Sequence, residues 1–132
     1  MTAALRMEHE LDPRQIILDA TKAEVEKLQP LGARVLIGTY IRPDRTKSGI
    51  YLSDKTRDED SYQGRVGLVL KMGPLAFVED EEHKWGDIRP KVGDWIVCSI
   101  GDARRMQLGK SPTRFVEDVH VQAIVTDPDI AW

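Results

Sequence analysis

The side chains best suited to catalysis or metal binding are few in this sequence and widely separated. Three histidines, His9, His83 and His120, and one cysteine, Cys98, are the candidate ligands. No two of them lie at the short spacing of a zinc site, and His9-Glu10 lacks the second histidine of a zinc-protease motif. The glycines occur singly, so none forms a phosphate-binding loop, and no nucleophile, base and oxyanion donors can be assembled. We therefore expect no enzyme, no metal site and no cofactor.

A long polar loop that carries a short apolar segment is the strongest candidate for a binding site. It covers residues 41–64, and Gly49-Ile50-Tyr51-Leu52 stands in it among charged and turn-forming residues. A structureless loop of this length is uncommon in a small domain and is usually functional or disordered. Because Ile50, Tyr51 and Leu52 cannot bury themselves locally, they need either the domain's own core or the groove of a partner.

The composition indicates one domain that binds neither nucleic acid nor membrane. The chain has 132 residues and a formal net charge of −3, with no marked excess of basic residues. It contains no apolar run of membrane-spanning length, and residues 1–11 lack the apolar centre of a signal peptide. A single cysteine excludes an internal disulfide and is typical of a reducing compartment such as the cytoplasm.

One helix is predicted near the start of the chain, over residues 13–28. Asp12 is suited to cap it, Pro13 to occupy its first turn and Gln15 to complete a capping box. Apolar residues then recur at helical spacing as far as Pro30, which ends the pattern. The helix packs either on the flank of its own domain or on a neighbouring subunit.

The rest of the chain predicts a small all-β domain, a barrel or a sandwich. Alternating or continuous apolar runs separated by glycine turns indicate strands at residues 34–41, 64–71, 95–100, 104–108, 114–116 and 119–125. Cys98 falls within an apolar strand and is expected in the core. Between the second and third strands, residues 75–90 carry four successive carboxylates, which repel one another and should remain in water; they are Glu79, Asp80, Glu81 and Glu82.

Four segments in order, around a loop of the right kind, resemble the GroES-type co-chaperonins, the chaperonin-10 family. The loop segment Gly49-Ile50-Tyr51-Leu52 falls where that family keeps its mobile loop. The other resemblances lie in Pro30-Leu31-Gly32-Ala33-Arg34-Val35-Leu36-Ile37, Gly64-Arg65-Val66-Gly67-Leu68-Val69-Leu70-Lys71-Met72-Gly73-Pro74 and Lys91-Val92-Gly93-Asp94-Trp95-Ile96-Val97, and residues 119–125 fit the closing strand. The resemblance implies a small, partly open β-barrel over residues 30–126, preceded by a helical extension (1–29) and followed by a tail (127–132).

The sequence also departs from the family pattern. Ala33 replaces an acidic residue, and Tyr51 replaces a small β-branched residue of the mobile loop. The segment 75–90, which is acidic, replaces a glycine-rich roof hairpin. Together with the added helix and tail, these departures predict a specialised relative, such as one encoded by a phage.

Two functions are compatible with this resemblance. In the first, copies of the chain form a homo-oligomeric ring in the cytoplasm. The ring caps a GroEL-type chaperonin through Gly49, Ile50, Tyr51 and Leu52, which dock on the chaperonin's apical domains, and the acidic residues 79–82 lie at the roof. In the second, a phage reuses the barrel in the virion as a capsid decoration or head-stabilising subunit, whose added arms hold neighbouring capsid proteins.

Overall fold

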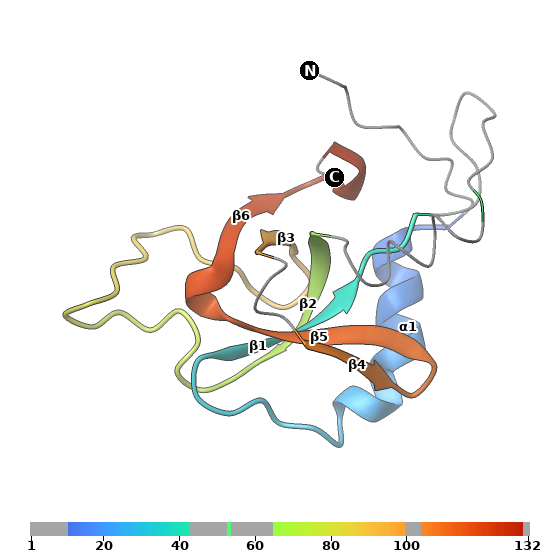
Figure 1. Ribbon diagram of the computed structural model, residues 1–132, viewed down its shortest axis with the longest axis horizontal. Coiled ribbons are helices and arrows are strands. Elements are labelled where there is room, and N and C mark those ends of the chain that lie inside the picture. Colours follow the sequence, from blue (N-terminus) through green and yellow to red (C-terminus); the bar gives the residue numbers. More distant parts are fainter. Residues whose placement is uncertain (1–10, 43–52, 54–64, 100–103, 131–132) are drawn as a thin grey trace.

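The structure, a computed structural model, describes residues 11–42, 53, 65–99 and 104–130. Within these ranges one α-helix precedes a set of short strands, and two 3-10 turns flank the last strand (Figure 1). In chain order the elements are α1 (Pro13–Val25), β1 (Arg34–Thr39), β2 (Val66–Met72), β3 (Trp95–Cys98), β4 (Arg104–Leu108), β5 (Ser111–Glu117), η1 (Asp118–His120), β6 (Val121–Val125) and η2 (Pro128–Ile130).

The strands form one antiparallel sheet in the order β4-β5-β1-β2-β3-β6. β1 lies near the centre, between β2 and β5, although β5 follows it by more than 70 residues. Across the described residues β4 and β6 remain at opposite edges, so the sheet is not closed. The mostly β, partly open fold expected from the sequence is therefore confirmed.

Both faces of the sheet are covered, which explains the continuous apolar character of β1. Val35 and Ile37 face one cluster, whose other members are Val69, Phe77, Ile96, Cys98 and Val116. Leu36 and Tyr40 face a second cluster, which also contains Val66, Leu68, Leu70 and Trp95 and is covered by apolar side chains of α1. The alternation predicted for this strand is confirmed, and so is the burial of Cys98 in the core.

Helix α1 begins as the sequence predicts and ends earlier. The Asp12 carboxylate accepts the backbone N–H of Arg14 at 3.0 Å. The helix stops at Val25, three residues before the predicted end, where the ammonium of Lys71 donates to the Val25 carbonyl at 3.2 Å. Gln15 does not complete a capping box; its side-chain amide donates to Asp19 instead.

The helix lies on the sheet of its own chain. A Cβ built on Gly38 would come within 2.6 Å of the Cγ2 of Ile17, so the missing side chain lets helix and strand approach closely. Ile17, Leu18 and Val25 pack against the second cluster. Of the two packing arrangements predicted, the structure shows the intramolecular one.

Two boundaries near the end of the chain differ from the prediction. β5 starts at Ser111 because Leu108 pairs with Ser111, which leaves only Gly109-Lys110 for the hairpin loop. Gly109 takes φ 62, as a two-residue loop requires at this position. The last strand begins at Val121 because η1 occupies residues 118–120, and the Asp118 carboxylate there accepts the backbone N–H of Phe77 at 3.0 Å.

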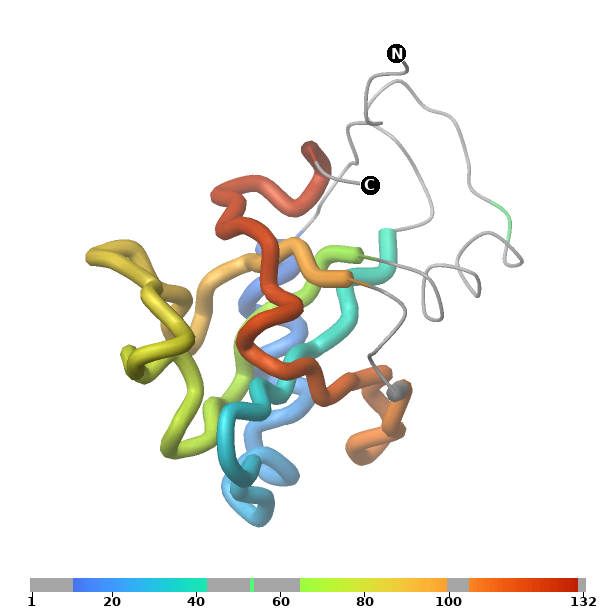
Figure 2. Tube along the Cα trace, turned by 60° about the vertical axis from the view of Figure 1, so that its left-hand side comes forward, coloured from blue at the N-terminus to red at the C-terminus, as the bar shows by residue number. Residues whose placement is uncertain are grey.

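The chain between β2 and β3 protrudes from the body of the molecule, as Figures 1 and 2 show in yellow-green to gold. Gly73 marks its start, where the chain passes close to the residues before β1. A Cβ at Gly73 would lie 2.3 Å from the carbonyl oxygen of Gly32, so only glycine fits there. Residues 75–90, which carry the four successive carboxylates, belong to this protrusion.

Candidate functional site

The segment predicted to bind a partner, Gly49-Ile50-Tyr51-Leu52, lies outside the described residues. Backbone hydrogen bonds hold the described chain on either side of it. The backbone N–H of Tyr40, just after β1, donates to the carbonyl of Val66 at 3.0 Å, and the N–H of Cys98 donates to the carbonyl of Arg65 at 2.9 Å. The connection over residues 43–64 therefore begins and ends on neighbouring hydrogen-bonded strands.

We call the hydrogen-bonded residues Tyr40, Arg65 and Val66 the base of the connection. Tyr40 anchors this base in the interior. Its side chain is 1% exposed, and its ring meets the edge of the Trp95 ring with centroids 5.4 Å apart. Its hydroxyl donates to the carboxylate of Asp129, in the turn after β6. Burial, together with this hydrogen bond, raises the pKa of Tyr40 far above its ordinary value, so the phenol stays neutral and acts as a donor.

The acidic residues of the protrusion, Glu79, Asp80, Glu81 and Glu82, are all exposed. Asp80 nevertheless organises its neighbours, because its carboxylate accepts the backbone N–H groups of Glu82 at 2.8 Å and His83 at 2.7 Å. The His83 ring lies 3.1 Å from the same carboxylate. This side-chain hydrogen bond is the main reason why the pKa of Asp80 is lowered.

Trp85 joins the protrusion to the first cluster of the sheet. Its ring stacks on His83 and meets Phe77 edge-on, with the Phe77 and Trp85 centroids 5.1 Å apart. The indole N–H donates to the Val78 carbonyl, and Arg89 donates to the Phe77 carbonyl and pairs with Glu79. Phe77 takes φ 58, a conformation unusual for a residue with a side chain, and its burial together with the Asp118 hydrogen bond holds it there.

Metal-binding chemistry does not assemble in the part of the chain that the structure describes. Among the described residues no three His, Cys, Asp or Glu side chains gather as metal ligands. The Cys98 thiol is buried and donates to the Arg65 carbonyl at 3.4 Å, and burial raises its pKa. His9 lies outside the described residues. No helix in the described ranges is long and apolar enough to cross a membrane.

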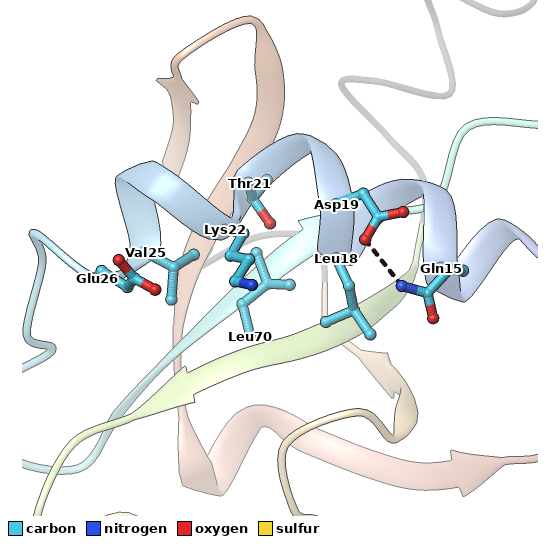
Figure 3. A pocket seen from close by; sticks show the side chains of 8 residues that line it. All are labelled: Gln15, Leu18, Asp19, Thr21, Lys22, Val25, Glu26 and Leu70. Atoms are coloured by element: carbon cyan, nitrogen blue, oxygen red, sulfur yellow. Dashed lines mark hydrogen bonds between the residues drawn. The ribbon is translucent and has the colours of Figure 1, made fainter.

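A shallow hollow of about 330 Å³ lies between α1 and β2 (Figure 3). Leu18, Val25 and Leu70 supply its apolar surface, and Gln15, Asp19, Thr21, Lys22 and Glu26 surround it. The side-chain amide of Gln15 donates to Asp19 at 2.8 Å across one end. The hollow reflects imperfect filling between helix and sheet, and its polar groups do not converge on a common point as in a cofactor site.

Comparison with known proteins identifies the family of this chain. The family described as the chaperonin 10 kDa subunit matches residues 27–125. This chain belongs to that family. A co-chaperonin GroES of Staphylococcus carnosus is 30% identical over 98 residues, which cover 74% of this chain and 98% of the relative. A co-chaperonin GroES of Caldicellulosiruptor saccharolyticus is 27% identical over 101 residues, which cover 76% of this chain and 99% of the relative.

The chaperonin 10 match leaves α1 before it and η2 after it. Sequence reasoning missed the link between these outer parts and the barrel, most clearly the Tyr40–Asp129 hydrogen bond. The only local signal was Asp127-Pro128, which indicates a turn; the Asp127 carboxylate accepts the N–H of Asp129 at 2.9 Å. The role of Asp80 in holding His83 was missed as well, although the two residues are three apart.

Proposed function

We propose that this chain is a co-chaperonin, a homo-oligomeric ring that caps a GroEL-type chaperonin and assists protein folding in the cytoplasm. The observation that carries the proposal is the family match over residues 27–125, which includes the whole sheet and the long connection between β1 and β2. The relatives named above are co-chaperonins, and the matched region covers nearly their full length. The function is therefore one of binding and assembly, without catalysis.

The proposed contact with the chaperonin is Gly49-Ile50-Tyr51-Leu52, which docks in a groove of the apical domain. The position of this segment supports the proposal, because the connection that carries it starts and ends on adjacent strands with a hydrogen-bonded base. Such a base fixes the two points at which the connection leaves and rejoins the sheet. Apolar residues in an otherwise polar connection then serve as anchors for a partner.

The energetics favour a reversible lid. Burying Ile50 and Leu52 gains roughly 1.5–3 kcal/mol each, whereas ordering a flexible segment costs on the order of 2–5 kcal/mol. A single loop would therefore bind weakly. Several loops on one ring bind together through effective concentration, and the ring can still be released when the chaperonin changes its affinity for each loop.

The protrusion between β2 and β3 is proposed as the roof of the ring. Its carboxylates, Glu79, Asp80, Glu81 and Glu82, are exposed and would face solvent or the folding chamber. The Phe77–Trp85 contact and the Arg89–Glu79 pair support a roof of fixed shape. In this proposal an acidic segment anchored on the first cluster takes the place of the family's glycine-rich roof hairpin.

Size-exclusion chromatography with a GroEL-type chaperonin tests the proposal directly. The full chain is mixed with the chaperonin with and without ATP, and co-elution is measured by fluorescence of a label. We expect nucleotide-dependent co-elution that Ile50→Asp abolishes. Ile88→Asp is the matched control, because Ile88 is 81% exposed on the protrusion and the same charge there should leave co-elution intact.

Two results would contradict the proposal. Wild-type chain that never co-elutes, with or without ATP, has no chaperonin-binding activity. Equal loss in the Ile50→Asp and Ile88→Asp variants would mean that charge anywhere on the surface disturbs binding, so residues 49–52 would not be the contact. Circular dichroism of each variant separates loss of binding from loss of folding.

A second candidate function is a phage virion subunit that decorates or stabilises the head. The feature that motivates it is that α1 and η2 lie outside the family match, although both pack on their own chain. In this alternative capsid proteins replace the chaperonin as partners. Mass spectrometry of purified virions decides between the two: stoichiometric amounts of the chain would favour this function, and its absence from virions would exclude it.

A further inference from the structure

The turn that follows β6 reaches across the molecule to the base of the long connection. β6 lies at an edge of the sheet, whereas β1 lies near the centre, with β2 and β3 between them. Asp129, in η2, nevertheless accepts a hydrogen bond from Tyr40, which follows β1 and is 89 residues away in the sequence. This contact ties the last described element of the chain to the strand from which residues 43–64 depart.

Both partners of this contact are withdrawn from water. Tyr40 is 1% exposed and Asp129 is 7% exposed. A buried carboxylate needs hydrogen-bond donors, and removing one of them is costly because its desolvation is no longer compensated. The Tyr40 hydroxyl is one such donor, so this hydrogen bond fixes the positions of the two side chains relative to one another.

The surroundings hold the contact on both sides. The Trp95 ring packs edge-on against Tyr40, and Trp95 also pairs with Val125 at the end of β6. The turn itself is closed by Asp127, whose side chain accepts the N–H of Asp129 and whose carbonyl accepts that of Ile130. The charges of Asp127 and Arg42 also act on the Tyr40 hydroxyl, and Arg42 is the last described residue before the connection.

From this geometry we infer that residues 127–130 are a clamp that positions the base of the β1–β2 connection, with Tyr40 and Asp129 as its positioning residues. The Tyr40 backbone N–H closes the base on Val66, so holding the Tyr40 ring also holds the first hydrogen bond below the connection. Without the clamp this end of β1 would open locally, and the connection would start from a wider range of directions. The contribution to partner binding rests on the function proposed above.

The experiment combines local hydrogen exchange with chaperonin affinity, both on the full chain. Tyr40→Phe removes the donor, and Asp129→Leu removes the acceptor at similar size. Asp129→Asn is the conservative variant, because its amide oxygen can still accept the tyrosine hydroxyl. We expect amide exchange at residues 38–42 and 65–67 to rise about tenfold in the first two variants, as losing one hydrogen bond implies, and to stay near wild type in Asp129→Asn.

Affinity for the chaperonin distinguishes positioning from simple stabilisation. Val116→Ala is the matched control, because it weakens the first cluster, on the other face of the sheet, which contains neither Tyr40 nor Trp95. At a temperature where circular dichroism shows every variant folded, we expect Tyr40→Phe and Asp129→Leu to weaken binding. Asp129→Asn and Val116→Ala should bind as wild type does.

The two readouts can fail separately. Wild-type exchange in both Tyr40→Phe and Asp129→Leu would overturn the clamp, and so would a loss of affinity in Val116→Ala as large as theirs. If the wild-type chain binds no chaperonin, the proposed function fails. The exchange at residues 38–42 then still decides whether residues 127–130 hold the base.

Discussion

At the scale of single residues, burial controls the ionisable groups of the sheet. It raises the pKa values of Tyr40 and the Cys98 thiol and lowers that of the Arg114 guanidinium. Tyr40 and Cys98 therefore remain neutral at physiological pH, and they serve as a hydrogen-bond donor and a core residue. The one lowered carboxyl pKa described above belongs to Asp80, on the exposed protrusion, where a specific hydrogen bond to His83 is the main cause.

The Asp80 contacts predict that the protrusion depends on pH in the acidic range. Because the folded-state pKa lies below the ordinary value of 3.8, the ionised carboxylate favours the folded turn above that pH. This contribution is lost as pH falls through the folded-state pKa. We expect the NMR signal of the Trp85 indole proton, which donates to Val78, to move toward its unfolded position over that range.

Asp80→Asn and Glu81→Gln test this assignment. Asp80→Asn should remove the acid-induced change in the Trp85 signal, because the titrating group is gone. Glu81→Gln removes an equally exposed carboxylate from the same run and should leave the change in place. An unchanged titration in Asp80→Asn would contradict the assignment.

At the scale of elements, the close approach of α1 and β1 makes the helix part of the barrel's packing. Gly38 allows Ile17 to reach the sheet, and Lys71 of β2 donates to the carbonyl at the helix end. A helix of this length is marginal in isolation, so the sheet stabilises it.

The predicted division of the chain at residues 29 and 126 remains a prediction.

Two neighbouring isoleucines test the packing of the helix. Ile17 is half-buried against the second cluster, whereas Ile16 is 49% exposed. We expect Ile17→Ala to lower the free energy of unfolding by about 1–2 kcal/mol through lost contacts. Ile16→Ala should change it by less than about 0.5 kcal/mol. Urea unfolding measures both, and equal effects would show that α1 does not depend on this face.

Local patterns predicted the elements well, and long-range contacts explain where they failed. Asp12-Pro13 identified the start of α1 because capping is local, whereas at its end the Val25 carbonyl accepts from Lys71, which lies far along the chain. Alternation predicted both faces of β1 for the same local reason. The start of β6 was wrong because Asp118 turns the chain to meet Phe77, a partner that no spacing reveals.

The candidate site was predictable only in its composition. An apolar segment in a long polar connection indicates a binding site from the sequence, but residues 49–52 lie outside the described residues and stay a prediction. The base that would hold the connection depends on Tyr40 meeting Asp129 across the sheet. A tyrosine at a strand end and an aspartate in a terminal turn have no local relation, so only the fold brings them together.

At the scale of the whole molecule, the described sheet is open. Its edge strands β4 and β6 have no second neighbour in the described part of the chain. An open edge offers unpaired backbone groups to another chain. Membership of the chaperonin 10 family agrees with assembly into an oligomer, and these edges are suitable places for it.

Light scattering tests assembly through β6. We expect the wild-type chain to elute with a mass that is a multiple of 14.9 kDa. Ile124→Lys, at a 38% exposed position on this edge strand, should shift the mass toward that of one chain. Ile88→Lys places the same charge on the protrusion and should leave the mass unchanged. An unaltered oligomer in Ile124→Lys would locate the interface elsewhere.

The strand order also delays completion of the sheet while the chain is synthesised. Val35 of β1 pairs with Val116 of β5, which the ribosome adds roughly 80 residues later. At roughly 5–20 residues per second this delay lasts about 4–16 s. Throughout this delay β1, which will be buried on both faces, lacks its neighbour β5. A member of a chaperonin-partner family must thus keep its own central strand soluble for seconds before the chain that completes it exists.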